Sequence, residues 1–137
     1  MADDSALALQ KALVSRLKSD AALSALVSGR VYDEPPQSVT FPYVRIGNID
    51  LRALRFSCGV DDDITFSIEC YSRPTSGRVE ATRIAAAVRA SLDDADLELT
   101  GFSLDWCDYL TQAVIRAADG QSYIATVAFE ASVALAD

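Results

Sequence analysis

The sequence has 137 residues, of which 50% are hydrophobic, and it carries a formal net charge of −8 at pH 7. This length predicts a single domain over residues 1–137, with enough apolar side chains for a core without disulfides or metal ions. The excess of carboxylates argues against binding to nucleic acid or to an anionic membrane, because both depend on Lys and Arg. The absence of histidine removes the commonest general base, the commonest metal ligand and every Ser-His or Cys-His nucleophile pair.

The N-terminal segment has no basic or apolar stretch of the kind that opens a secretory signal, and no apolar run reaches the roughly 20 residues of a membrane span. We therefore expect no membrane partner. The three cysteines, Cys58, Cys70 and Cys107, are widely spaced and form no Cys-x-x-Cys pair. This usage predicts reduced, buried thiols in a cytosolic protein.

Residues 5–18 are predicted to form an amphipathic helix, because three leucines recur at every fourth position. These leucines are Leu9, Leu13 and Leu17. Ser5 is placed as the N-cap of this helix, and Asp20 as the N-cap of a short second helix over 21–27. A short extended piece follows at 30–33.

Residues 43–49 are predicted as a strand, and residues 64–71 as a second one, since 64–71 alternate strictly between apolar and polar side chains. The segment between them, 50–62, is open to two interpretations, a long hairpin arm or a mobile loop. It contains Leu51, Leu54 and Phe56. Apolar groups exposed there would suit docking on a neighbouring protein.

A second long helix is predicted from residue 75 or 76 to about Leu92. Its core-facing stripe is Ala81, Ile84, Ala85, Val88 and Leu92. A second line lies off this stripe, and it has two interpretations: alanines are good helix formers, or small side chains let another subunit approach closely. The candidate subunit-interface residues are therefore Leu51, Leu54, Phe56, Val79, Arg83, Ala86 and Ala90.

The C-terminal third is predicted to be a hairpin, with strands at about 104–116 and 123–135 joined by a turn at Asp119-Gly120. The last strand is longer than the usual five or six residues, so we expect part of it to project beyond the sheet and to pair elsewhere. The predicted fold class is α+β, an antiparallel sheet of about four strands with two main helices packed on one face.

The run Asp61-Asp62-Asp63 has two interpretations, a solvated turn or a Ca²⁺ or Mg²⁺ loop, and the missing EF-hand spacing favours the turn. Asp105 and Asp108 are expected on opposite sides of a strand, where they cannot converge for acid–base chemistry. Neither phosphate-loop pattern nor dinucleotide fingerprint occurs. We therefore predict no enzyme, no catalytic residue, no cofactor and no metal site.

Two sequence pieces, Gly29-Arg30-Val31-Tyr32-Asp33 and Phe41-Pro42-Tyr43-Val44, are the most specific part of a resemblance that covers nearly the whole chain. Together with the opening helix, the 64–71 strand, the alanine-rich helix and the Asp119-Gly120 hairpin, they resemble the tail-completion proteins of long-tailed phages. That family, also called tail terminators or head-to-tail joining proteins, includes prophage and gene transfer agent versions.

The resemblance implies a homo-oligomeric ring, usually a hexamer, that caps the finished tail tube and stops its polymerisation. The implied partners are the tail tube protein and the head-tail connector protein, with DNA passing through the lumen without specific binding. The implied location is the bacterial cytoplasm during assembly and then the tail of the virion or phage-like particle. Asp61, Asp62 and Asp63 are candidate lumen or loop charges that would repel DNA phosphates.

Two other functions stay open on the sequence. The first is another ring-forming minor tail or head-tail connector protein, which shares the α+β design. The second, from a different class, is a small carboxylate-dependent or metal-binding enzyme. Native mass spectrometry separates a sixfold ring from a monomer that holds a divalent ion.

Overall fold

The computed structural model describes residues 4–56, 59–73 and 78–135, without the side chains of 54–60. The helices are α1 (Ser5–Ser19), α2 (Ala21–Val27) and α3 (Val79–Leu92). The strands are β1 (Val31–Tyr32), β2 (Tyr43–Phe56), β3 (Gly59–Ser72), β4 (Glu98–Leu99), β5 (Phe102–Arg116) and β6 (Tyr123–Leu135). Within the described residues no helix is long and apolar enough to cross a membrane.

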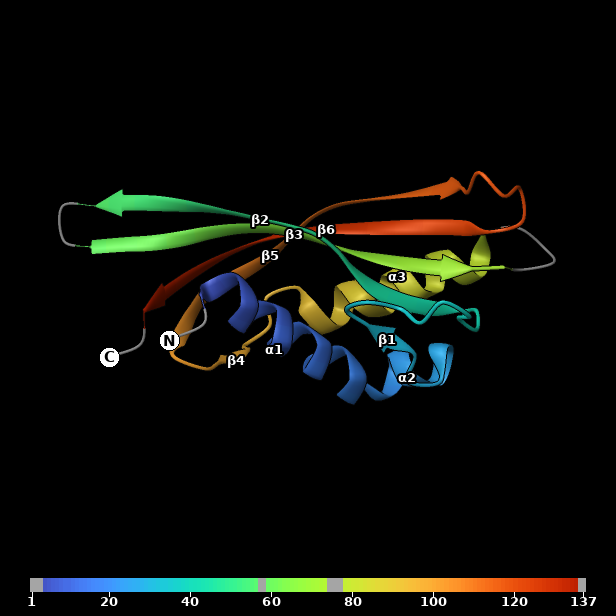
Figure 1. Ribbon diagram of the computed structural model, residues 1–137, viewed down its shortest axis with the longest axis horizontal. Helices are drawn as coiled ribbons and strands as arrows, with labels where there is room; N and C mark the ends of the chain where they lie inside the picture. Colours follow the sequence, from blue (N-terminus) through green and yellow to red (C-terminus); the bar gives the residue numbers. More distant parts are fainter. Residues whose placement is uncertain (1–3, 57–58, 74–77, 136–137) are drawn as a thin grey trace.

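The strands form one sheet in the order β1-β2-β3-β6-β5-β4, in which only the β1–β2 pair is parallel. The α+β class and the predicted covering of one sheet face by the two main helices are confirmed (Figure 1). The predicted count of about four strands falls short of the six observed. The two additional strands, β1 and β4, pair through only two residues each, too few to show a periodic pattern in the sequence.

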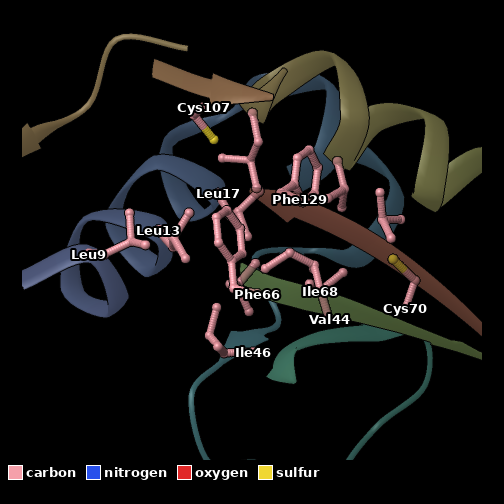
Figure 2. Packing of buried hydrophobic residues seen from close by; sticks show 14 of the residues in the cluster. Leu9, Leu13, Leu17, Val44, Ile46, Phe66, Ile68, Cys70, Cys107 and Phe129 are labelled. Carbon is pink, nitrogen blue, oxygen red and sulfur yellow. The ribbon is translucent and has the colours of Figure 1, made fainter. Parts of the chain in front are cut away.

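The core lies between the helices and the inner face of the sheet (Figure 2). The predicted leucine row of α1 and the predicted stripe of α3 are fully buried in it. Phe66 of β3 and Phe129 of β6 stack at its centre, with ring centroids 5.2 Å apart. Cys70 and Cys107 are free, buried thiols, and burial raises the pKa of Cys107 to about 12. Cys58 lies outside the described residues.

The sequence predicted the N-cap residue of α2 correctly and that of α1 wrongly. Asp20 caps α2 as predicted, because its carboxylate accepts the amide of Leu23 at 2.9 Å. The predicted cap of α1 is wrong, since Asp4 fills that role by accepting the amide of Leu7. Ser5 is instead buried in the first turn, where its hydroxyl donates to Oδ2 of Asp62 at 2.5 Å.

The last strand, β6, has the predicted length but not the predicted exposure. It is the central strand of the sheet, paired with β3 from Asp62↔Val133 to Ser72↔Tyr123 and with β5 from Phe102↔Leu135 to Arg116↔Tyr123. The expectation that part of β6 projects and pairs elsewhere is therefore wrong. From Tyr123 to Val133 its backbone is paired on both sides, so the long open edges available for further strand pairing lie on other strands.

Residues 50–56 and 59–62 lie on the paired strands of a hairpin arm, which contradicts the mobile-loop interpretation; residues 57–58 lie outside the described residues. β2 and β3 stay in register out to Phe56↔Gly59. The resulting two-stranded ribbon extends beyond the helices at one end of the molecule (Figure 1). The run Asp61-Asp62-Asp63 lies within β3, so the solvated-turn interpretation is also wrong.

Candidate assembly surfaces

The second line of α3 is solvent-exposed, as a subunit contact requires. Val79 is 54% exposed, and Arg83, Ala86 and Ala90 are exposed as well. The opposite side of the helix carries the buried stripe, because 3.6 residues per turn separate the two lines by about half a turn. A role of these four residues in subunit contact stays a prediction.

A shallow groove of about 350 Å³ separates α3 from β5. It is lined by Ala86, Arg89, Ala90, Asp93 and Gln112. Ala86 and Ala90 contribute only methyl groups to this lining, and such short side chains leave open space at the bottom of the groove. The guanidinium of Arg89 stacks 3.9 Å from the ring centroid of Tyr109 on β5, so one wall of the groove is held in place by a cation–π contact.

The hairpin arm presents a partly exposed apolar side chain on the helix-side face of the sheet, on its edge strand β2. Leu51 pairs in register with Ile64, which belongs to the core, yet Leu51 is 42% exposed. The backbones of Leu54 and Phe56 pair with Asp61 and Gly59, but their side chains lie outside the described residues. Of the three arm candidates, Leu51 is thus the one whose exposure is known.

The three consecutive aspartates have different environments. Asp62 accepts the Ser5 hydroxyl on the helix-side face, whereas Asp63 is buried on the outer face, where its Oδ2 contacts Nη2 of Arg52 at 3.2 Å. Desolvation raises the pKa of Asp61, and the charge of Asp105 and a hydrogen bond to it raise the pKa further. Asp62 and Asp63 are thus bound to a hydroxyl and to a cation within the subunit, whereas the described neighbour of Asp61 is another carboxylate, so Asp61 is the stronger candidate for a lumen charge.

Carboxylates gather on the outer face of the sheet, around β6. Asp105 is the extra residue of a β-bulge, and its carboxylate accepts the Ser132 hydroxyl at 3.2 Å. The bulge reverses the alternation, so Asp105 and Asp108 share the outer face; the expectation that they face opposite sides is wrong. Glu130 joins them, with a pKa raised chiefly by a hydrogen bond to Asp63.

This outer-face grouping is the feature that sequence reasoning missed, because it assumed unbroken alternation; the three-residue step between the inward-facing Leu104 and Cys107 is the signal of the bulge. It is not arranged as a metal centre: within the described residues no group of three or more Cys, Asp or Glu side chains could hold a metal ion. Trp106 lies on the same face and is 39% exposed, so this large aromatic side chain belongs to the surface and not to the core.

Comparison with known proteins identifies the family. The family model for "Tail completion protein gp17" matches residues 11–134. The chain belongs to the tail completion protein gp17 family. The resemblance drawn from the Gly-Arg-Val-Tyr-Asp and Phe-Pro-Tyr pieces is thereby confirmed. No curated protein sequence matches the chain.

One solved structure of a particle contains a chain that is similar to this tail completion protein. A chain in the structure "Virion of native gene transfer agent (GTA) particle" is 30% identical and superposes with a TM-score of 0.88. The match covers 96% of the present chain and 99% of the other. The similarity therefore extends over nearly the whole chain, and it agrees with the expected gene transfer agent members of the family.

Proposed function

We propose that the protein is a structural subunit of a ring, a hexamer in the simplest case, that caps the tail tube of a phage-like particle. The ring stops tube polymerisation and offers a docking surface to the head connector. The observation that carries the proposal is the match over nearly the whole length of the chain to a component of a gene transfer agent virion. Membership of the tail-completion family supports the same role.

A structural role agrees with the chemistry of the surface. The described outer-face carboxylates lie on an open sheet, and the groove beside α3 is shallow, with alanines as two of its five lining residues. Neither arrangement encloses a substrate or positions a nucleophile against a base. We therefore propose assembly and not catalysis as the function.

The acidity of the subunit supplies a mechanism for DNA passage. Six copies of −8 would carry about −48, and carboxylates facing the lumen would repel the phosphates of DNA. Asp61 is the best placed of the three aspartates to contribute, since it has no hydrogen bond to a cation or a hydroxyl in the described structure. Asp61→Asn particles are expected to deliver DNA less efficiently at low ionic strength, with full delivery restored by added salt.

Loss of the gene tests the proposed function. A terminator controls tube length, so particles assembled without it are expected to carry tails of uncontrolled length in electron micrographs. Tails of normal length that fail only to join heads would instead identify the protein as a head-tail connector. A stoichiometric ring seen by native mass spectrometry, with tail tube protein present, would support both assembly roles against a monomeric enzyme.

A further inference from the structure

The sheet has two edges that are open over most of their length. β1 covers only Val44 and Arg45 of β2, and β4 covers only Phe102 and Ser103 of β5. Within the part of the chain that the structure describes, each of the two long strands is paired beyond those positions with a neighbouring strand on one side alone. An edge of this kind presents backbone N–H and C=O groups that another strand can bind.

On β2 the direction of the free amides follows from one hydrogen bond and the register. Val44 donates its amide to the Arg30 carbonyl at 2.9 Å, so it points away from β3. Alternation repeats this direction every second residue, and the bulge between Ile46 and Ile49 shifts it by one position. The amides of Leu51 and Ala53 therefore point outward from the open edge of the arm.

On β5 the same reasoning divides the edge into a closed and an open part. The Cys107 carbonyl accepts the amide of Asp94 at 2.8 Å, and the Tyr109 amide donates to Oδ1 of Asp93 at 2.9 Å. The loop after α3 thus occupies the edge at residues 107–109. A second bulge follows between Tyr109 and Thr111, after which the amides of Gln112 and Val114 point outward.

The open part of β5 lies next to the groove beside α3. Gln112 lines this groove together with Ala86 and Ala90, whose methyl side chains leave space at the sheet edge. A strand added to β5 would therefore lie beside the exposed line of α3. Its helix-side side chains would cover the two alanines.

We propose that the open edge of β2 in one copy pairs with the open edge of β5 in the next copy, so that the sheet continues across the subunit boundary. This inference rests on the proposed ring function and names the interface that builds the ring. Leu51 would enter the groove, where the small side chains of Ala86 and Ala90 accept it. The exposed Arg52 would lie on the same outer face as Asp105 and Asp108 of the neighbour.

The strand directions agree with this pairing. From β2 through β3 and β6 to β5 every neighbour is antiparallel, so β2 and β5 run in opposite directions. A neighbour in the same orientation then continues the antiparallel alternation. Because the two edges differ, the contact is heterologous, and a heterologous contact builds a ring when its rotation closes, not a twofold dimer.

Proline substitutions block each edge separately. Ala53→Pro and Gln112→Pro remove an outward amide, which an edge strand tolerates because its own ladder loses no bond. Ala53→Ser and Gln112→Ala are the matched controls, since both retain the amide. Far-UV circular dichroism and protected β6 amides in hydrogen exchange establish that each variant is folded.

Native mass spectrometry then gives a distinctive result. Each proline variant alone is expected to stay monomeric, whereas both controls form rings. An equimolar mixture is expected to yield dimers and nothing larger, because each copy retains one complementary edge. Rings formed by either folded proline variant at wild-type yield would overturn the inference, as would dimers of one variant with itself.

Hydrogen exchange of the wild-type protein makes the test independent of the variants. In the ring, the amides of Leu51, Ala53, Gln112 and Val114 are expected to exchange at least about tenfold more slowly than in the monomer. A wild-type ring without this protection would overturn the inferred interface and leave the proposed function intact. A wild-type protein that forms no ring, even with tail tube protein, would overturn both.

Discussion

At the scale of single residues, the stacked pair Phe66 and Phe129 holds the sheet against the helices. Both rings are fully buried, and Tyr109 meets Phe129 edge-on at 6.1 Å between centroids. Phe66→Ala or Phe129→Ala is expected to lower the free energy of unfolding by roughly 3–5 kcal/mol, because the removed ring leaves a cavity. Urea unfolding measures the change. Ile115→Ala, at a position that is 58% exposed, is the control and should change the free energy by less than about 1 kcal/mol.

The Glu130 carboxyl gives a pH-dependent prediction at the same scale. Its pKa is raised above 4.5 in the folded protein, chiefly by the hydrogen bond to Asp63. The folded state therefore binds this proton more tightly than the unfolded state, so the stabilisation is present below about pH 4.5 and is lost as pH rises through the raised pKa. Glu130→Gln mimics the protonated form at every pH.

The measurement compares urea midpoints of wild type and Glu130→Gln across a pH series. The variant is expected to gain stability relative to wild type as pH rises above 4.5, the ordinary value of a glutamate. A constant difference between wild type and Glu130→Gln would contradict the raised pKa.

At the scale of elements, α3 has a buried core face and, opposite to it, the exposed line that we propose as a subunit contact. Val79→Glu or Ala86→Glu is expected to weaken the ring at least about tenfold while leaving the urea midpoint nearly unchanged, because both side chains are exposed in the subunit. Sedimentation velocity gives the ring fraction. Ala22→Glu on α2 introduces the same charge at an exposed alanine and serves as the control. If Val79→Glu or Ala86→Glu were unfolded, the second line of α3 would belong to the core and not to the surface.

At the scale of the whole molecule, net charge opposes assembly. Each subunit carries −8, so copies repel one another at low ionic strength. Raising the ionic strength from about 0.01 M to about 0.15 M shortens the Debye length from about 30 Å to about 8 Å. The ring fraction in native mass spectrometry or light scattering is therefore expected to rise with salt. A fall would show that specific ion pairs across the interface, such as those of Arg52, outweigh the net repulsion.

Periodicity in the sequence determined the elements and the core. Leucines spaced by four gave α1, and strict alternation from Ile64 gave the buried face of β3, because side-chain direction repeats every 3.6 residues in a helix and every two in a strand. The same helical periodicity distinguished the core-facing stripe of α3 from the second line on its opposite side. The Asp119-Gly120 turn and the family resemblance could also be recognised from the sequence alone, since both rest on residue identity at fixed positions.

Only the tertiary structure decided which surfaces are available for assembly. The long β6 turned out to be central and the arm to be an open edge, because strand order depends on contacts between distant segments, which local spacing does not encode. The bulge at Asp105 brought carboxylates together on the outer face, and the loop after α3 closed one part of the β5 edge while leaving the rest open. The sequence by itself thus determined which elements the chain forms, and the packing of its sheet decided which strand edges and side chains are exposed for the contact that we propose.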